Sequence, residues 1–160
     1  PESAAGLWTR TTSDFWMDGL RGSDITLIAG AAIVDPEGYD NAMVEISAVR
    51  SRRLYGERMP VPISMWRPWL AWMGRDGGAR ASFFGNPVVE SAGRRVAPLI
   101  CYEQLLVWPV LQSMLHSPDV LVAVGNDWWT AGTNVLAVQR ASTQAWARLF
   151  AMPLVLSFNT

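Results

Sequence analysis

The single cysteine of the chain, Cys101, stands two residues before a carboxylate, Glu103, and directly after the apolar run 96–100. Such a run is typical of a buried strand. Nucleophiles of α/β enzymes are often presented at the carboxyl end of a strand, because the following turn lifts the side chain into a crevice. A nearby carboxylate can take the proton of the thiol and return it to a leaving group. The alternative is a small, buried core cysteine, and both interpretations stay open from these residues alone.

Two further segments carry polar side chains that the same argument places near this thiol. Glu2 stands in a Pro-Glu-Ser sequence at the start of the chain, and Asn126, Asp127 and Trp128 follow the apolar run 119–124. Because the carboxyl ends of neighbouring parallel strands meet at one edge of a sheet, we expect these groups in one crevice. Asn126 and Asp127 are also common turn formers, so a purely local role is the alternative for them.

The composition excludes several classes of site. One cysteine and one histidine, His116, cannot supply the ligand spacing of a metal centre, so we expect no metal and no cofactor. His116 falls at the end of an expected helix, which does not favour a Cys–His catalytic pair. The formal net charge of -1 and the pI of about 5.8 give no electrostatic basis for binding nucleic acid. No apolar stretch reaches the ~20 residues that cross a bilayer.

The length and composition are those of one globular domain. The 160 residues are 50% hydrophobic and 17% charged, which is enough apolar surface for a sizeable core. The second half alternates between expected strands and helices, and this order implies an α/β fold with parallel strands covered by helices. The first half predicts a helix, with Ser13 as its N-cap, and then a β-hairpin. The expected strands are residues 24–34, 41–49, 96–100, 119–124 and 153–158, and the expected helices are residues 13–20, 104–115 and 134–150.

The connection between residues 55 and 95 is longer than the ~15 residues beyond which connections are usually functional lids or arms. Within it Trp66, Trp69 and Trp72 recur every three residues, a spacing that would place them on one side of a helical turn. A packed lid is the favoured interpretation of such a stripe. The alternative is an arm that touches a membrane surface, because tryptophan prefers the level of the lipid headgroups. We expect this arm or lid at about residues 60–95.

Several short motifs occur in the order and approximate spacing of the nitrilase, or carbon–nitrogen hydrolase, superfamily. They are Pro-Glu-Ser (1–3), Tyr-Gly-Glu-Arg-Met-Pro-Val-Pro (55–62), Ile-Cys-Tyr-Glu (100–103), Gly-Asn-Asp-Trp-Trp (125–129) and Phe-Asn-Thr (158–160). The chain most resembles the apolipoprotein N-acyltransferase branch. The segments Arg-Met-Pro-Val-Pro and Met-Trp-Arg-Pro-Trp resemble still more closely those of a group of conjugal-transfer proteins. The resemblance covers nearly the whole chain, and Cys-Tyr-Glu together with Asn-Asp-x-Trp is its specific part.

The resemblance implies a nitrilase-like α-β-β-α sandwich, present as a single partial domain over residues 1–160 that lacks the first strand and the C-terminal part. Glu2 matches the general base, and Cys101 matches the nucleophile that forms a thioester with an acyl group. Glu103 matches a second glutamate that supports the nucleophile and the transferring groups. The positions that we take as substrate contacts are Tyr102, Asn126, Asp127 and Trp128.

The catalytic lysine of the family is replaced in this chain by Glu57. A cation at that position stabilises the tetrahedral oxyanion, an effect typically worth ~3 kcal/mol or more, whereas a glutamate repels the same anion. The chain has no lysine, and all 13 of its basic residues are arginines. Arg58 is therefore the candidate stand-in, with a purely electrostatic role because arginine cannot give up its proton. A solvated surface arginine is the alternative.

Two hypotheses follow for the function. The first is an enzyme that performs thiol-dependent acyl transfer or amide hydrolysis on a small-molecule or lipid-acyl substrate. The second is a catalytically impaired module that serves as a binding or structural part of a membrane-associated conjugation apparatus. The resemblance implies a place on the periplasmic side of the bacterial inner membrane, with contact to the membrane surface through Trp66, Trp69 and Trp72. Association into a homo-oligomer occurs in the superfamily and stays open for this chain.

Overall fold

The computed structural model describes residues 5–74, 78–126 and 132–159, whose strands form two sheets. The first sheet is antiparallel, in the order β1-β2-β3, and the second has the order β4-β5-β6-β7. In the second sheet β4 pairs antiparallel with β5, while β5, β6 and β7 are parallel. The strands are β1 (Leu27–Asp35), β2 (Gly38–Ile46), β3 (Ser51–Gly56), β4 (Val89–Ser91), β5 (Arg94–Ile100), β6 (Val120–Asn126) and β7 (Leu154–Asn159).

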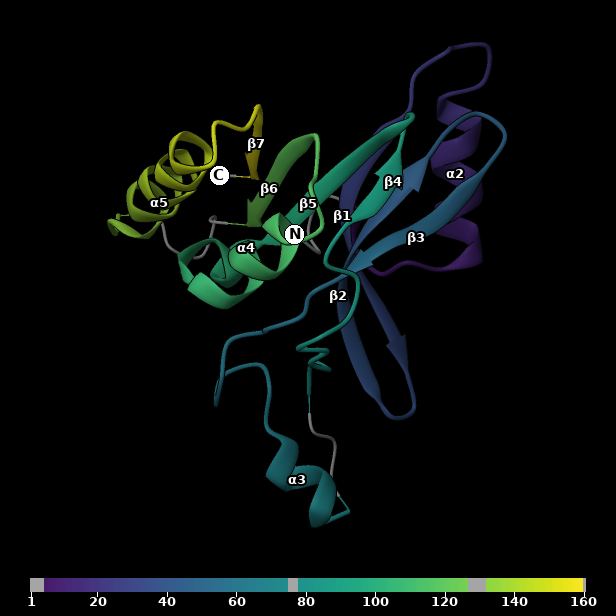
Figure 1. Cartoon of the computed structure of the whole chain (residues 1–160). Helices are drawn as coiled ribbons and strands as arrows, with labels where there is room; N and C mark the ends of the chain where they lie inside the picture. The colour runs from purple at the N-terminus through teal and green to yellow at the C-terminus, as the bar shows by residue number, and fades with distance from the viewer. Residues whose placement is uncertain (1–4, 75–77, 127–131, 160) are drawn as a thin grey trace.

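The helices cover the outer faces of the two sheets (Figure 1). One helix, α2 (Arg10–Gly19), packs on the first sheet, and α4 (Val107–Met114) and α5 (Val135–Leu149) pack on the second. The expected α/β fold and its α-β-β-α layering are thereby confirmed, because each apolar face of a sheet is buried against a helix or against the other sheet. Within the described ranges, no helix combines the length and the apolar character needed to cross a membrane.

The core between the two sheets is the layer that bears on the site. It joins the inner face of β2 and β3 to the inner face of β5 and β6, and Cys101 packs against its margin. A second apolar layer lies between β5, β6 and the helices α4 and α5. The buried side chains of the layer between the sheets are Met43, Leu54, Tyr55, Val96, Ile100, Val122 and Val124.

The parallel part of the second sheet agrees with the predicted alternation, but two strands were not predicted. β3 begins with Ser51 and two arginines, so its sequence lacks the apolar run that signals a strand, and β4 has only three residues. The predicted N-cap Ser13 is wrong. The helix begins at Arg10, and the side chain of Thr9 accepts a hydrogen bond from the backbone N–H of Thr12 at 3.1 Å. Ser13 is instead buried inside this helix.

The segment between β3 and β4 projects from the two-sheet body and carries the short helix α3 (Pro68–Trp72) (Figure 1). Arg80, in the part of this segment that follows α3, pairs with Asp35 at 2.6 Å and Asp40 at 2.9 Å and so ties the segment to the β1–β2 hairpin. This pairing lowers the pKa of Asp35 below its usual range. At Gly78, where φ is +79°, an added Cβ would lie 2.2 Å from the carbonyl oxygen of Met65, so only glycine fits this close approach.

The three tryptophans of this segment do not share one helical face. Trp66 precedes α3 and packs edge-on against Phe83, with ring centroids 5.1 Å apart. Trp69 and Trp72 lie within α3 and are 42% and 88% exposed. The predicted common stripe is therefore wrong for Trp66, which fixes the base of the arm, while Trp69 and Trp72 face solvent.

Candidate active site

Cys101 occupies a sharp turn at the end of β5, where the 3-10 helix η1 (Cys101–Leu105) begins. Its φ is +46°, a left-handed conformation that is uncommon for any residue other than glycine. The thiol is partly buried, and its Sγ accepts a hydrogen bond from Nε2 of Gln139 on α5 at 3.7 Å. Backbone strain of this kind persists only where the surroundings hold it, and it concentrates at functional sites. The predicted presentation of the thiol at a strand end is thus what the fold provides.

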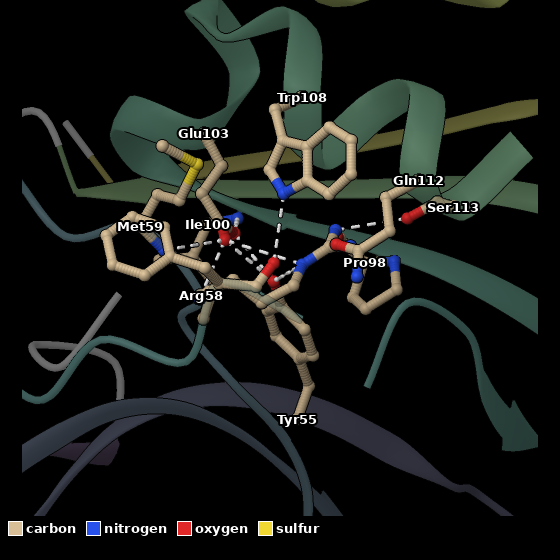
Figure 2. A network of polar contacts seen from close by, with 10 residues as sticks. Tyr55, Arg58, Met59, Pro98, Ile100, Glu103, Trp108, Gln112 and Ser113 are labelled. Carbon is tan, nitrogen blue, oxygen red and sulfur yellow. Dashed lines mark hydrogen bonds and ion pairs between the residues drawn. The ribbon is translucent and has the colours of Figure 1, made fainter. Parts of the chain in front are cut away.

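The carboxylate of Glu103 is completely buried and accepts hydrogen bonds from both sheets (Figure 2). From its own segment it accepts the N–H of Ile100 at 2.8 Å. From the end of β3 it accepts the N–H of Arg58 at 2.8 Å and that of Met59 at 3.3 Å. The Tyr55 hydroxyl donates to it, at 2.8 and 2.9 Å from the two carboxylate oxygens. Glu103 therefore links the turn that carries Cys101 to the segment after β3.

Burial dominates the titration of this network. It raises the pKa of Glu103 above its usual range, against the opposing effects of the Arg58 charge and of the hydrogen bonds from Ile100 and Tyr55. Burial, together with the negative charge of Glu103, also raises the pKa of Tyr55 well above its usual range. Tyr55 therefore stays a neutral phenol that donates to the carboxylate across the physiological pH range.

Arg58 has no exposed surface, and its guanidinium is held by groups on the side of α4. It donates to the Tyr55 hydroxyl at 2.9 Å, to Oε1 of Gln112 at 2.8 Å and to Oγ of Ser113 at 3.0 Å. Its Nε lies 3.8 Å from the Glu103 carboxylate, which makes a fully buried ion pair. The solvated alternative for Arg58 is therefore wrong. Its role as a stand-in for the family lysine stays a prediction, and the partners of its guanidinium weigh against it.

Glu57, which by the resemblance stands in place of the family lysine, is buried directly after β3. It is 4% exposed, and its carboxylate accepts a hydrogen bond from Nδ2 of Asn41 on β2 at 2.6 Å. The backbone N–H of Glu57 donates to the carbonyl of Asn41 at 2.7 Å, so the pair is fixed through main chain and side chain together. Asn41 and Glu57 thus form a hydrogen-bonded amide–carboxylate pair at the place where the resemblance predicts a cation.

The remaining predicted site residues divide into described and undescribed positions. Asn126 ends β6 and is buried, with its Oδ1 accepting from Nδ2 of Asn159 on β7 at 3.4 Å. Tyr102 follows Cys101 in η1 and is partly buried. Glu2, Asp127 and Trp128 lie outside the described residues. In the described ranges no group of three or more His, Cys, Asp or Glu side chains is arranged to hold a metal ion.

Several polar side chains that build the site were not predicted. Gln104 is fully buried and receives the Thr143 hydroxyl at 3.0 Å, while its carbonyl accepts from Ser142 at 2.7 Å. These bonds hold α5 against η1. A signal for them was present in the sequence of α5. Gln139, Thr143 and Ala147 are spaced four residues apart and share the buried face of this helix, where large apolar side chains are usual.

This geometry can support nucleophilic chemistry at sulfur. The thiol of Cys101 is partly exposed on the turn after β5, and the hydrogen bond from the N–H of Ile100 to the buried Glu103 carboxylate holds that turn in place. Tyr55, Arg58 and Ile100 all donate to the Glu103 carboxylate, so Glu103 ties the turn that carries Cys101 to the segment after β3.

Comparison with known proteins places the chain among sequences of the same pattern. The profile of the family described as "Carbon-nitrogen hydrolase" matches residues 7–148. The chain is 61% identical over all 160 residues to the "Conjugal transfer protein TraB" of Agrobacterium fabrum and to the "Probable conjugal transfer protein TraB" of Sinorhizobium fredii. It spans 38% and 41% of the length of these relatives. The likeness to conjugal-transfer proteins expected from the sequence is confirmed.

Solved structures show the same fold at low identity. A carbon-nitrogen hydrolase from Helicobacter pylori G27 matches with a TM-score of 0.69 and 12% identity, over 94% of this chain and 51% of that one. A C145A mutant of an amidase of the nitrilase superfamily from Nesterenkonia AN1 matches with a TM-score of 0.63 and 12% identity, over 92% and 52% of the two chains. The predicted nitrilase-like sandwich is thereby confirmed.

The buried pair of Glu103 and Arg58 predicts a strongly non-additive loss of stability. Replacing Glu103 by alanine strands a buried guanidinium, and we expect a loss of about 3–5 kcal/mol in the free energy of unfolding. The double variant Glu103→Ala, Arg58→Met removes both charges and should cost clearly less than the sum of the two single variants. Urea unfolding of the four proteins measures this coupling.

A surface pair supplies the matched control. Arg21 and Asp18 form an ion pair with side chains 78% and 67% exposed, and the same cycle there should give a coupling below about 1 kcal/mol. If the losses in the free energy of unfolding were additive for Glu103 and Arg58, so that their coupling energy equalled that of the surface pair, the two buried residues would not form a coupled unit.

Proposed function

The chain belongs to the carbon–nitrogen hydrolase family, and on this premise we propose that it performs thiol-dependent acyl transfer or amide hydrolysis through an acyl-enzyme on Cys101. The observation that carries the proposal is the left-handed turn at the end of β5, which holds the chain's one thiol partly exposed above a fixed carboxylate network. A core cysteine needs no such turn. The strain is accounted for if the turn serves to present the sulfur.

In the proposed reaction the Cys101 thiolate attacks the carbonyl carbon of an amide or an activated ester. The C–S bond forms while the carbonyl π pair moves to oxygen, and collapse of this intermediate expels an amine or alcohol that takes up the proton lost by the thiol. Water or a second amine then attacks the thioester, which releases an acid or a new amide and restores the thiol. By its match to the family pattern, Glu2 is the group proposed to carry the proton.

Glu103 has a positioning role in this proposal. Its bonds to the N–H groups of Ile100 and Arg58 set the distance between the nucleophile turn and the segment that contains Glu57. A misplacement of about 1 Å between such segments can cost two orders of magnitude in rate. The carboxylate therefore contributes to catalysis through geometry.

The absence of the family lysine supports a second candidate, a catalytically impaired module that binds a partner within a conjugation apparatus. Glu57 brings a carboxyl group to the place where an oxyanion would need a positive charge, and the Arg58 guanidinium is held by Gln112 and Ser113. Both candidates assign the chain a role in conjugal transfer, in line with the relatives named for that process. They differ in whether the thiol still turns over.

We also propose that α3 touches a membrane surface, with the domain on the periplasmic side of the inner membrane. The support is an arm that projects from the body and carries α3 (Figure 1). The side chains of Trp69, Trp72 and Met73 on this arm are exposed. Tryptophan and methionine side chains of this exposure favour the interface between headgroups and acyl chains. The acyl donor in this arrangement would be drawn from a lipid.

Acylation of Cys101 is the direct test of the enzymatic candidate. Treatment of the full-length protein with an activated acyl ester at pH 8 should add one acyl group to the peptide that contains Cys101, read by mass spectrometry. In the variant Cys101→Ala the same peptide should stay unmodified, because the substitution removes its thiol. If no acyl group is added while iodoacetamide still alkylates the thiol, the impaired-module candidate is the one that stands.

Substitutions at residue 57 test whether the missing cation limits the reaction. Glu57→Lys should accelerate the acylation of Cys101 by about 10-fold or more, because a single oxyanion-stabilising group is worth 10²–10³ in rate. Glu57→Gln, which removes the carboxylate without adding a cation, is the matched control and should give a smaller gain. Equal rates for the two variants would show that the charge at this position does not limit the chemistry.

Vesicle binding tests the proposed role of α3. The protein should sediment with vesicles of phosphatidylethanolamine and phosphatidylglycerol, and replacing Trp69 and Trp72 by alanine should remove most of that binding. Phe84→Ala is a suitable control, since Phe84 is 80% exposed and lies outside the helix. Binding that survives the loss of both tryptophans, or that falls equally in the control, would exclude α3 as the contact.

A further inference from the structure

The side chain of Gln139, on α5, contacts the thiol of Cys101. It belongs to the buried face of α5, is 2% exposed, and donates from Nε2 to Sγ of Cys101 at 3.7 Å. Its second polar atom, Oε1, is buried and accepts no hydrogen bond from any described residue. A buried acceptor without a donor costs about 1–3 kcal/mol, and it calls for a reason.

The surroundings hold Gln139 in place. The Thr143 hydroxyl donates to the carbonyl of Gln139 at 2.8 Å and lies 3.0 Å from Oε1 of Gln104. Gln104 in turn donates to the carbonyl of Val124 on β6 at 2.9 Å. The amide is therefore fixed against the nucleophile turn by a chain of bonds that runs from α5 through η1 to the sheet.

From this we propose that Gln139 is a positioning residue for Cys101, which orients the sulfur and stabilises its thiolate by donating an N–H to it. The inference rests on the proposed thiol chemistry and deepens it. Where the family has a cation, this chain has Glu57. A neutral N–H donor can still favour the thiolate, because its hydrogen bond stabilises the negative sulfur without a positive charge. The buried Oε1 without a hydrogen-bond donor lowers the stability of the fold, and this cost accompanies the placement of Nε2 against the sulfur.

Among the described residues, other polar or charged side chains lie on or next to η1, β3 and α5. Tyr102 and Glu103 lie on η1 with Cys101, Tyr55 packs on the same core layer from β3, and Glu57 and Arg58 follow β3. On α5 the charged Arg140 lies over the Phe158 ring, 5.3 Å from its centroid. Because substitution of Gln139 leaves all these groups unchanged, a change in the thiol's titration can be assigned to the amide.

The test is the pH profile of Cys101 alkylation by iodoacetamide in the full-length protein. In Gln139→Met the profile should move up by about one pH unit, which is about ten-fold slower alkylation below its midpoint, while the melting temperature stays equal or rises because the orphaned amide is gone. Gln139→Glu, which keeps the shape but adds a negative charge, should move the profile further in the same direction. Gln144→Met, on the exposed face of α5, is the control and should leave it unchanged.

Two outcomes would overturn the inference. One is an unchanged profile in both Gln139 variants, and the other is a lower melting temperature in Gln139→Met with the wild-type profile, which is the behaviour of a purely structural residue. Failure of the proposed function is read separately, because alkylation needs only the thiol. A wild-type protein that takes no acyl group can still show the shift, and one that is acylated normally can lack it.

Discussion

The buried carboxylate of Glu103 is the interaction on which the arrangement of the site depends. It accepts hydrogen bonds from Ile100 at the end of β5 and from Arg58 and Met59 after β3, so one side chain joins the two sheets at the edge where Cys101 lies. A buried carboxyl group is tolerated only if its acceptors are satisfied, and here backbone donors, a phenol and a guanidinium satisfy it together. The position of Cys101 is therefore fixed by a polar contact that neither sheet could make alone.

This network also decides what Arg58 can do. A fully buried guanidinium must be neutralised and bonded at several of its donors, and the Glu103, Tyr55, Gln112 and Ser113 side chains meet that need. The planar, multiply bonded head that makes arginine suitable for this task also prevents it from swinging toward the thiol, since leaving would strand both a carboxylate and the hydroxyl partners. The contacts in the described residues therefore hold the Arg58 guanidinium within this buried network.

The sequence predicted the parts of the fold that follow from periodicity. The alternation of apolar strands and helices from β5 to β7 was read correctly, because the sequences of these strands are mainly apolar. β5 and β6 are buried along most of their length, whereas β7 alternates between half-buried and exposed positions. β3 was missed because its first half is polar, and η1 because a left-handed residue at Cys101 has no signature in residue type. Of the candidate site, the nucleophile turn and Glu103 were found from motifs. Tyr55, Asn41 and Gln139 were not, because their partners lie 48, 16 and 38 residues away in the chain.

The distribution of charge around the thiol sets the terms for any chemistry here. Glu57 and Glu103 both bring buried carboxyl groups to the strand ends, and the buried Arg58 is paired with Glu103. A thiolate and a tetrahedral oxyanion are both anions, and a nearby negative charge disfavours both. Neutral hydrogen-bond donors can also stabilise such anions. The amide of Gln139 is placed to do so without moving, because hydrogen bonds hold α5 against η1. A hydrogen bond from an amide held in this way stabilises an anion at sulfur without adding a charge to the buried layer.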